Sequence, residues 1–238
     1  MNYTTYVTDL ANFIAQNSTS ATFQALLPDT ITYATNRIYR DLDPISATVT
    51  DGSASLTPNN RSFTPPSSVG QFGYLVIESL NVMTPSTAIY PAGTRNPVQF
   101  VSLAFVDSVY PSNSTGTGIP RFAFMRSPNE IVLGPAPDLA YPVELTGTVR
   151  PAELSSANSS TFLTQVLPEL FFAASMVFVS GYMRDFGGQM DNPAQSQSWE
   201  AQYKLLLEGA NIEELRKQYM SQGWTTAQPN AVATPPRV

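Results

Sequence analysis

Hydrophobic residues near the start of the sequence recur with the spacing of two amphipathic helices. The first pattern follows Thr4 or Thr5 as a candidate N-cap and ends near Asn17. Its apolar face carries Tyr6, Leu10, Phe13 and Ile14. The second pattern begins at Pro28, because the missing N–H has no cost at the first helical position, and it ends before Pro44. Its inward positions are Ile31, Ala34, Ile38 and Leu42.

From Ile45 the apolar spacing approaches two, and Pro or Gly interrupts the chain at short intervals. Short apolar runs bounded by turn residues predict strands at 46–50, 74–82, 121–125, 130–133 and 141–149. In the last run, apolar and polar or small residues alternate as a strand with one buried face requires. Residues 100–110 fit a short helix as well as they fit a strand.

Helical spacing returns after Pro151. Ser160 or Thr161 is the candidate N-cap of a long apolar helix that reaches about Phe186 and ends at Gly187-Gly188. Its most apolar part, 170–182, is shorter than the ~20 residues that cross a bilayer. We therefore expect a helix that is buried on all sides, and no contact with a membrane.

A last amphipathic helix is predicted to start near Asn192-Pro193. Its apolar positions are Trp199, Tyr203, Leu206, Leu207, Ile212, Leu215 and Tyr219. Its charges, expected on the solvent or partner side, are Glu208, Glu213, Glu214, Arg216 and Lys217. After Gly223 nothing periodic remains, and this segment should be extended or disordered in the free chain.

The order of these elements predicts an α+β fold. Two N-terminal and two C-terminal helices would form a four-helix core, with an antiparallel β domain inserted between them and an extended C-terminal tail. The expected boundaries are 1–44 and 152–222 for the two parts of the helical core, 45–151 for the β domain and 223–238 for the tail.

The composition excludes most familiar catalytic sites. The sequence has no His and no Cys, which removes the preferred ligands of zinc and the Ser-His and Cys-His nucleophile pairs. It also lacks a glycine-rich phosphate loop. We expect no enzyme, no cofactor and no metal site. The formal charge of −6 argues against a nucleic-acid reader, and a charged fraction of only 13% favours a surface that other protein covers.

The densest charge cluster consists of Arg37, Arg40, Asp41 and Asp43 at the end of the second predicted helix. A set of ion pairs within the chain is one interpretation. Contacts across a subunit interface are another, because the planar guanidinium suits carboxylate pairing. A calcium site is disfavoured, because a helix end lacks the ligand-rich loop that calcium needs.

Two further features leave alternatives open. A carboxylate-based glycosidase needs neither His nor Cys, and its candidate acids are Asp41, Asp43, Glu78, Glu130, Asp138 and Glu144. Trp224 lies beyond the last helix and either folds back onto that helix or anchors a flexible segment in a groove of a partner.

Several motifs resemble the head-to-tail adaptor (head-completion, portal-binding) proteins of short-tailed bacteriophages. They are spread over most of the chain: Arg37-Ile38-x-Arg40-Asp41-Leu42 after Pro28, Gly118-Ile119-Pro120-Arg121-Phe122, 131–138, 141–145, 150–155, Leu167-Pro168-Glu169-Leu170 and 199–203. The resemblance implies a homododecameric ring in the virion neck, below the portal protein and in contact with tail nozzle or fibre proteins. DNA would pass through this connector during genome ejection without sequence-specific binding.

The resemblance also implies a C-terminal tail that reaches the portal. The residues expected to dock there are Trp224, Thr225, Gln228, Pro229, Val232, Pro235 and Val238. A β-rich binding module of a tail fibre or receptor-recognition protein is the alternative function, and a carboxylate-based hydrolase is the third.

Overall fold

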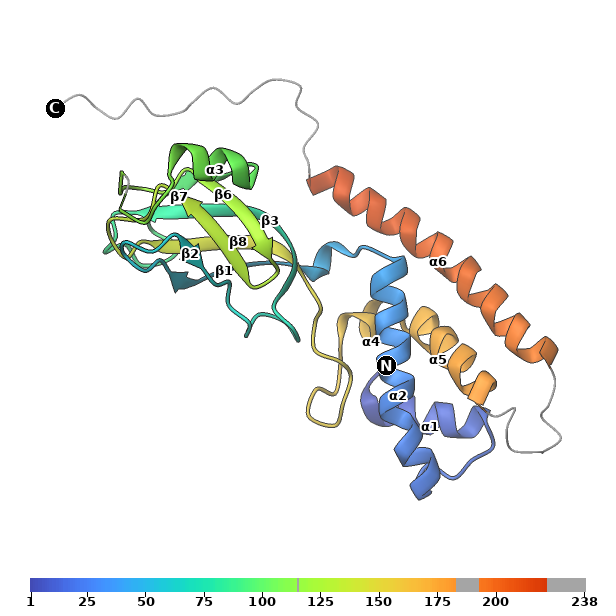
Figure 1. The fold of residues 1–238 in the computed structure, drawn as a ribbon. Helices are drawn as coiled ribbons and strands as arrows, with labels where there is room; N and C mark the ends of the chain where they lie inside the picture. Colours follow the sequence, from blue (N-terminus) through green and yellow to red (C-terminus); the bar gives the residue numbers. More distant parts are fainter. Residues whose placement is uncertain (115, 183–192, 222–238) are drawn as a thin grey trace.

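The computed structural model describes residues 1–114, 116–182 and 193–221, with side chains from 197 to 219 in the last range. Residues 1–41 together with 162–182 and 193–221 form a helical unit, and the middle of the chain forms a β-rich unit beside it (Figure 1). Each unit has its own hydrophobic core. The α+β class is confirmed.

The first helix of the helical unit is α1 (Tyr3–Phe13). Asn2 caps it by accepting a hydrogen bond from the Thr5 N–H, so the expected caps lie inside the helix. Three of the four predicted face residues are buried, but Phe13 is 60% exposed. Its ring packs edge-on against Phe172 and Trp199 at the rim of the core.

The second helix, α2 (Ala21–Asp41), begins earlier than predicted. The Ser20 hydroxyl caps it, and buried Phe23 and Leu27 extend its apolar face toward the N-terminus. Pro28 therefore lies inside the helix, because the burial of this longer face outweighs the hydrogen bond that proline cannot donate. The predicted inward positions from Ile31 onward are all buried.

The long apolar helix is divided into α4 (Phe162–Val166) and α5 (Pro168–Tyr182). Thr161 caps α4 in a reciprocal pair of hydrogen bonds with Thr164, which confirms one of the two candidate caps. Pro168 cannot donate the N–H that would continue α4, so a new helix starts there. The predicted end at Gly187-Gly188 lies outside the described residues. Among the described residues, no helix combines the length and the hydropathy that a bilayer crossing requires.

The last helix, α6 (Pro193–Ser221), starts at the predicted proline and runs along α5 (Figure 1). The face that it buries carries Tyr203, Ala210 and Glu214. Glu214 was expected on the solvent or partner side, and that prediction is wrong. Three predicted core positions are exposed on the opposite face: Ile212, Leu215 and Tyr219. Both faces of α6 hold apolar residues, so periodicity alone does not select the side that packs.

The β-rich unit consists of two four-stranded sheets that share one core. The first sheet has the order β1 (Thr48–Ser55), β8 (Pro142–Val149), β3 (Tyr74–Thr84) and β4 (Thr94–Pro97). The second has the order β2 (Ser62–Phe63), β7 (Glu130–Gly134), β6 (Phe122–Ser127) and β5 (Gln99–Phe100). All pairs are antiparallel except β5 with β6.

The five predicted strands are present as β1, β3, β6, β7 and β8, but Ser46 and Ala47 of the first one belong to a 3-10 turn, and β1 continues to Ser55. The strands that the sequence did not indicate, β2, β4 and β5, have two to four residues, too few for an alternating pattern. In the ambiguous segment 100–110 the helix interpretation holds, as α3 (Leu103–Val109), and only Phe100 belongs to a strand, as the last residue of β5.

The chain enters and leaves the β-rich unit at one place. A single 3-10 turn, η1 (Ile45–Ala47), leads from α2 into β1, and β8 leads back toward α4. Thr48 at the start of β1 pairs with Thr148 near the end of β8. The two connections to the helical unit therefore lie side by side.

Candidate functional site

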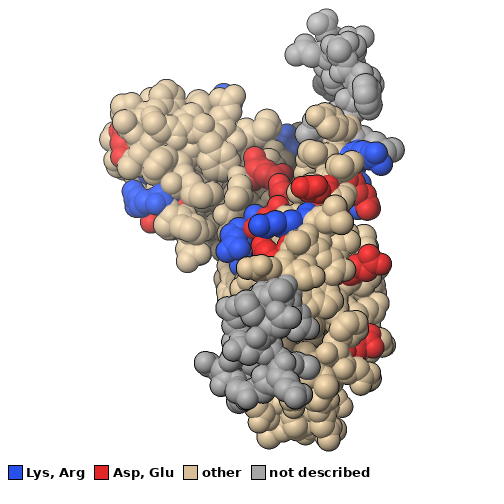
Figure 2. All heavy atoms as spheres, turned by 90° about the vertical axis from the view of Figure 1, so that its right-hand side faces the viewer, with Lys and Arg blue, Asp and Glu red and all other residues tan. Residues whose placement is uncertain are grey.

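Charged side chains gather where the end of α2 meets α6 and the entry to the β-rich unit. Figure 2 shows them concentrated in the middle of one face, whereas most of the remaining surface is uncharged. The Arg37 cluster consists of Arg37, Asp41, Glu200, Tyr203 and Lys204. The Glu214 cluster consists of Ile45, Glu213, Glu214 and Lys217.

Arg37 joins α2 to α6. Its Nη2 donates to Glu200 Oε1 at 2.7 Å, its Nε lies 3.7 Å from Asp41 Oδ2, and its side chain is only 12% exposed. The guanidinium carbon lies 4.1 Å from the centre of the Tyr203 ring. Burial by itself lowers the pKa of Arg37, but the hydrogen bond to Glu200 and the neighbouring groups outweigh it, and the net pKa is raised. The charge of Arg37 is thus held by contacts within the chain.

Tyr203 makes the second polar connection between these helices. Its hydroxyl donates to Asp41 Oδ2 at 2.9 Å. Burial and this hydrogen bond raise the pKa of Tyr203, so the hydroxyl remains a donor at neutral pH. Together, the two contacts fix the position of α6 against the end of α2.

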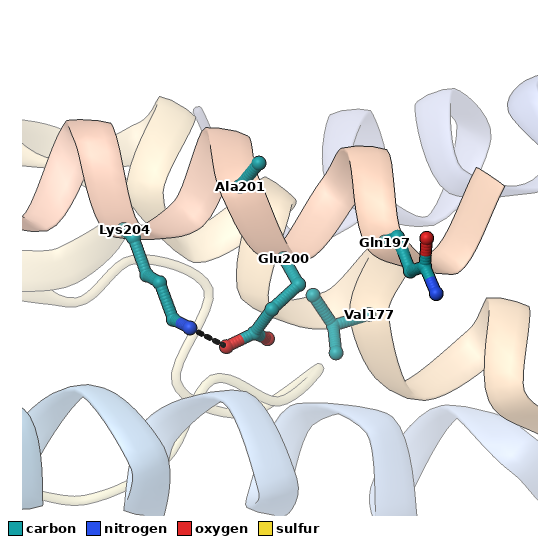
Figure 3. Close-up of a pocket in the computed structure, with 5 residues that line it drawn as sticks. All are labelled: Val177, Gln197, Glu200, Ala201 and Lys204. Atoms are coloured by element: carbon teal, nitrogen blue, oxygen red, sulfur yellow. Dashed lines mark ion pairs between the residues drawn. The ribbon is translucent and has the colours of Figure 1, made fainter. Parts of the chain in front are cut away.

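Glu200 also borders a shallow pocket of about 410 Å³ between α5 and α6 (Figure 3). The pocket is lined by Val177, Gln197, Glu200, Ala201 and Lys204. Lys204 points toward Glu200, with Nζ 3.6 Å from Oε1. The hydrogen bond from Arg37 lowers the pKa of Glu200, so this carboxylate is ionised and paired. An acid held in that state is a poor proton donor, and the lining offers no second carboxylate for acid–base chemistry.

The Glu214 cluster attaches α6 to the entry of the β-rich unit. Glu214 is 3% exposed, and its Oε2 accepts the Ile45 N–H at 3.1 Å. Lys217 donates to Glu214 Oε1 at 2.7 Å and lies 2.8 Å from Glu213. Hydrogen bonds to Glu213 and Glu214 raise the pKa of Lys217. The buried carboxylate thus has a backbone donor and a cation, as a buried charge requires.

The exit from the β-rich unit is attached to α2 by separate contacts. Arg150 Nη1 donates to Asn36 Oδ1 at 2.6 Å, and the Thr32 hydroxyl donates to Glu153 at 2.8 Å. The orientation of the two units therefore depends on polar contacts at both connections.

The four residues of the predicted interface cluster differ in their exposure and in their contacts. Arg37 and Asp41 serve contacts inside the chain, whereas Arg40 has a side chain that is 72% exposed, with Nε 3.4 Å from Asp41. Asp43 is exposed, and its carbonyl accepts a hydrogen bond from Gln218 at 3.3 Å. The residues expected to dock on the portal, from Trp224 to Val238, lie outside the described residues.

Sequence reasoning missed the partners on α6. Glu200 and Tyr203 occur within a quoted motif, but no local pattern connects them with Arg37, 163 residues away from Glu200 in the sequence. Glu214 was assigned to the solvent or partner side together with the other charges of this helix. The pairing of Arg37 with Asp41 follows from their separation of four residues on a helix.

Five of the six candidate glycosidase acids each accept a hydrogen bond from a separate side chain that is not an acid. Asp41 accepts from Tyr203, Glu78 from Thr148, Glu130 from Ser62 and Arg126, Asp138 from Tyr141, and Glu144 from Arg95 and Asn81. Hydrogen bonds from Arg95 lower the pKa of Glu144, which is opposite to what a general acid needs. Across the described residues, no group of three or more acidic side chains could hold a metal ion.

These contacts belong to a protein of the α+β class whose paired charges join its own elements. A family model described as SU10 adaptor protein matches residues 1–232. The chain belongs to this family, and it is a bacteriophage adaptor protein. No curated protein matches it. Membership confirms the resemblance to phage adaptors, implies a non-enzymatic role in the virion, and implies contact with other virion components such as the portal.

Proposed function

We propose that the chain is a neck component of a short-tailed phage virion, where it completes the head by joining the portal to the tail. The family match over residues 1–232 carries this proposal. The low charged fraction of 13% supports it, because few ions must lose their water when neighbouring proteins cover the surface.

Identical copies would form a ring, as a homododecamer, with a channel through which the genome leaves. Twelve copies with a formal charge of −6 each carry −72 in total. An acidic channel wall repels phosphate and a neutral wall does not attract it, so either guides duplex DNA without holding it by ion pairs. Binding of duplex DNA to the assembled ring should therefore be weak at moderate salt.

Arg40 and Asp43 are the members of the charge cluster that would contact the neighbouring subunit. Both are exposed at the end of α2. Arg37 and Asp41 would support them indirectly, because their bonds to α6 hold this helix end in place. Contacts of this kind set the register between subunits more than they add affinity.

The segment after Gln222 would dock on the portal. Pro229, Pro235 and Pro236 favour an extended backbone, and Trp224 would be the main anchor. Val232 and Val238 would add apolar contacts, and Thr225 and Gln228 polar ones. Ordering such a segment costs about 1–2 kcal/mol per residue, so the docked form needs these anchors.

The test compares the full chain with a chain that ends at Gln222, each mixed with purified heads that contain a portal but no tail. Sedimentation of the heads separates bound from free protein, and electron microscopy of the pellet locates the bound protein. We expect the full chain at the portal vertex and the shortened chain in the supernatant. Trp224→Ala should reduce binding more than the matched control Thr226→Ala.

Two results would contradict parts of this proposal. Equal binding of both chains would show that the helical unit carries the attachment. Failure of the full chain to bind heads, or its location away from the portal vertex, would refute the adaptor role itself.

A further inference from the structure

The helix α6 has an uncovered apolar face directly opposite its own core. Successive helical residues are rotated by about 100°, so Ile212 lies about 180° from the centre of the buried face formed by Tyr203, Ala210 and Glu214. Ile212 is 53% exposed. Three large side chains lie within about 60° of it and are 71%, 50% and 64% exposed: Leu205, Leu215 and Tyr219.

On this face, residues that lie equally far before and after Ile212 along the helix have complementary charge or size. Glu208 lies four residues before it and Arg216 four residues after it, and within the described part of the chain neither forms an ion pair. Gly209 lies three residues before it, in open space, and the large Leu215 lies three residues after it.

We propose that this face docks on the same face of a second copy of the chain, with the two α6 helices antiparallel and a two-fold axis at Ile212. Each residue before Ile212 then lies level with the residue equally far after it in the other copy. Glu208 faces Arg216, and Gly209 leaves room for Leu215. A parallel pair would place each of these charges against its own copy, so charge complementarity selects the antiparallel arrangement.

The groove beside this face fits the same occupant. It has a volume of about 490 Å³ and lies between α6 and the start of α5. Its lining includes apolar Val166 and Leu205 together with the acids Glu169 and Glu213. The antiparallel arrangement brings the aliphatic stem of Arg216 of the second copy over this apolar lining, while its guanidinium stays level with Glu208.

The size of the contact predicts a weak dimer. From Leu205 to Tyr219 the helix rises by about 21 Å. A single helix face of this length belongs at or below the small end of specific interfaces, about 1,200 Å² in total, so we expect dissociation in the micromolar range. A two-fold pair is closed, whereas a cyclic ring needs two different faces on each subunit. The dimer is therefore a state of the free chain, and it does not depend on the proposed neck function.

Sedimentation velocity on the full chain over a wide concentration range tests the pairing. Glu208→Arg and Arg216→Glu should each weaken the dimer by about tenfold or more, since each places like charges together twice, and the double variant should restore it. Ile89→Glu is the control, because Ile89 is 82% exposed on the β-rich unit. A chain that is monomeric at all concentrations overturns the proposal, as does a double variant that is weaker than both single variants.

Cysteine cross-linking tests the orientation, because the natural chain has no cysteine. Under mild oxidation, Ile212→Cys should form a disulfide dimer across the axis. Leu205→Cys should not pair with itself, because its two copies lie about 21 Å apart, but it should pair with Tyr219→Cys in a mixture. Self-pairing of Leu205→Cys as fast as that of Ile212→Cys would overturn the antiparallel arrangement.

Discussion

Replacing Arg37 by alanine should destabilise the helical unit by about 2–4 kcal/mol. Loss of the charged hydrogen bond to Glu200 accounts for about 1.5–3 kcal/mol of this. Loss of the contact with the Tyr203 ring adds about 0.5–1 kcal/mol. Glu200 is 31% exposed and lies beside Lys204, so water and this lysine partly compensate the carboxylate, and the full penalty of a stranded buried charge does not apply.

Urea unfolding followed by far-ultraviolet circular dichroism measures this loss, as a lower midpoint at an unchanged slope. The matched control is Arg40→Ala, three residues later on the same helix. Its side chain is 72% exposed, so the change should stay below about 0.5 kcal/mol. Equal losses in the two variants, or a loss below about 0.5 kcal/mol for Arg37→Ala, would refute the assignment of Arg37 as the connection between α2 and α6.

Three other changes test separate parts of the fold. Hydrogen bonds from Arg95 hold the pKa of Glu144 below its ordinary value of 4.5, so the stabilisation is present above pH 4.5 and is lost as the pH falls through the lower folded value. Glu144→Gln should therefore flatten the decline of the unfolding free energy between neutral and acid pH. Pro28→Ala should raise the free energy of unfolding by about 1–3 kcal/mol, because it restores a hydrogen bond inside α2. The measurement is a higher urea midpoint at an unchanged slope. Gly147→Ala should lower the thermal midpoint by several degrees, because its methyl group would collide with the Val76 carbonyl on the neighbouring strand.

The parts of the fold that could be predicted depend on local signals that tertiary contacts leave intact. The inward positions of α2 from Ile31 onward repeat at helical spacing, and the proline at the start of α6 tolerates only a few helical positions. Pro28 led to the wrong helix start. The helix begins before this proline, because Phe23 and Leu27 are buried in the core. A local preference of a few kcal/mol loses to the burial of two large side chains.

Only the part of the candidate site that lies on α2 could be predicted from the sequence. Arg37 and Asp41 stand out because they are charged residues of opposite sign one helical turn apart. Their partners Glu200 and Tyr203 lie more than 150 residues later, and only the packing of α6 brings them close. Glu214 was misplaced for a related reason. A carboxylate is expected to be exposed to water unless a hydrogen-bond donor lies beside it. The donor to Glu214 is the Ile45 N–H, which belongs to a different part of the fold, so no local pattern predicts it.

The adjacent connections of the β-rich unit make this part of the molecule exchangeable. Thr48 and Thr148 are opposite each other in neighbouring strands, so the gap between the two connections is only about 5 Å. A short loop, or an unrelated domain with neighbouring ends, could replace everything between them without moving α2 or α4. Exchange of the β-rich unit would leave the hydrophobic core of the helical unit intact, because the two units have separate cores.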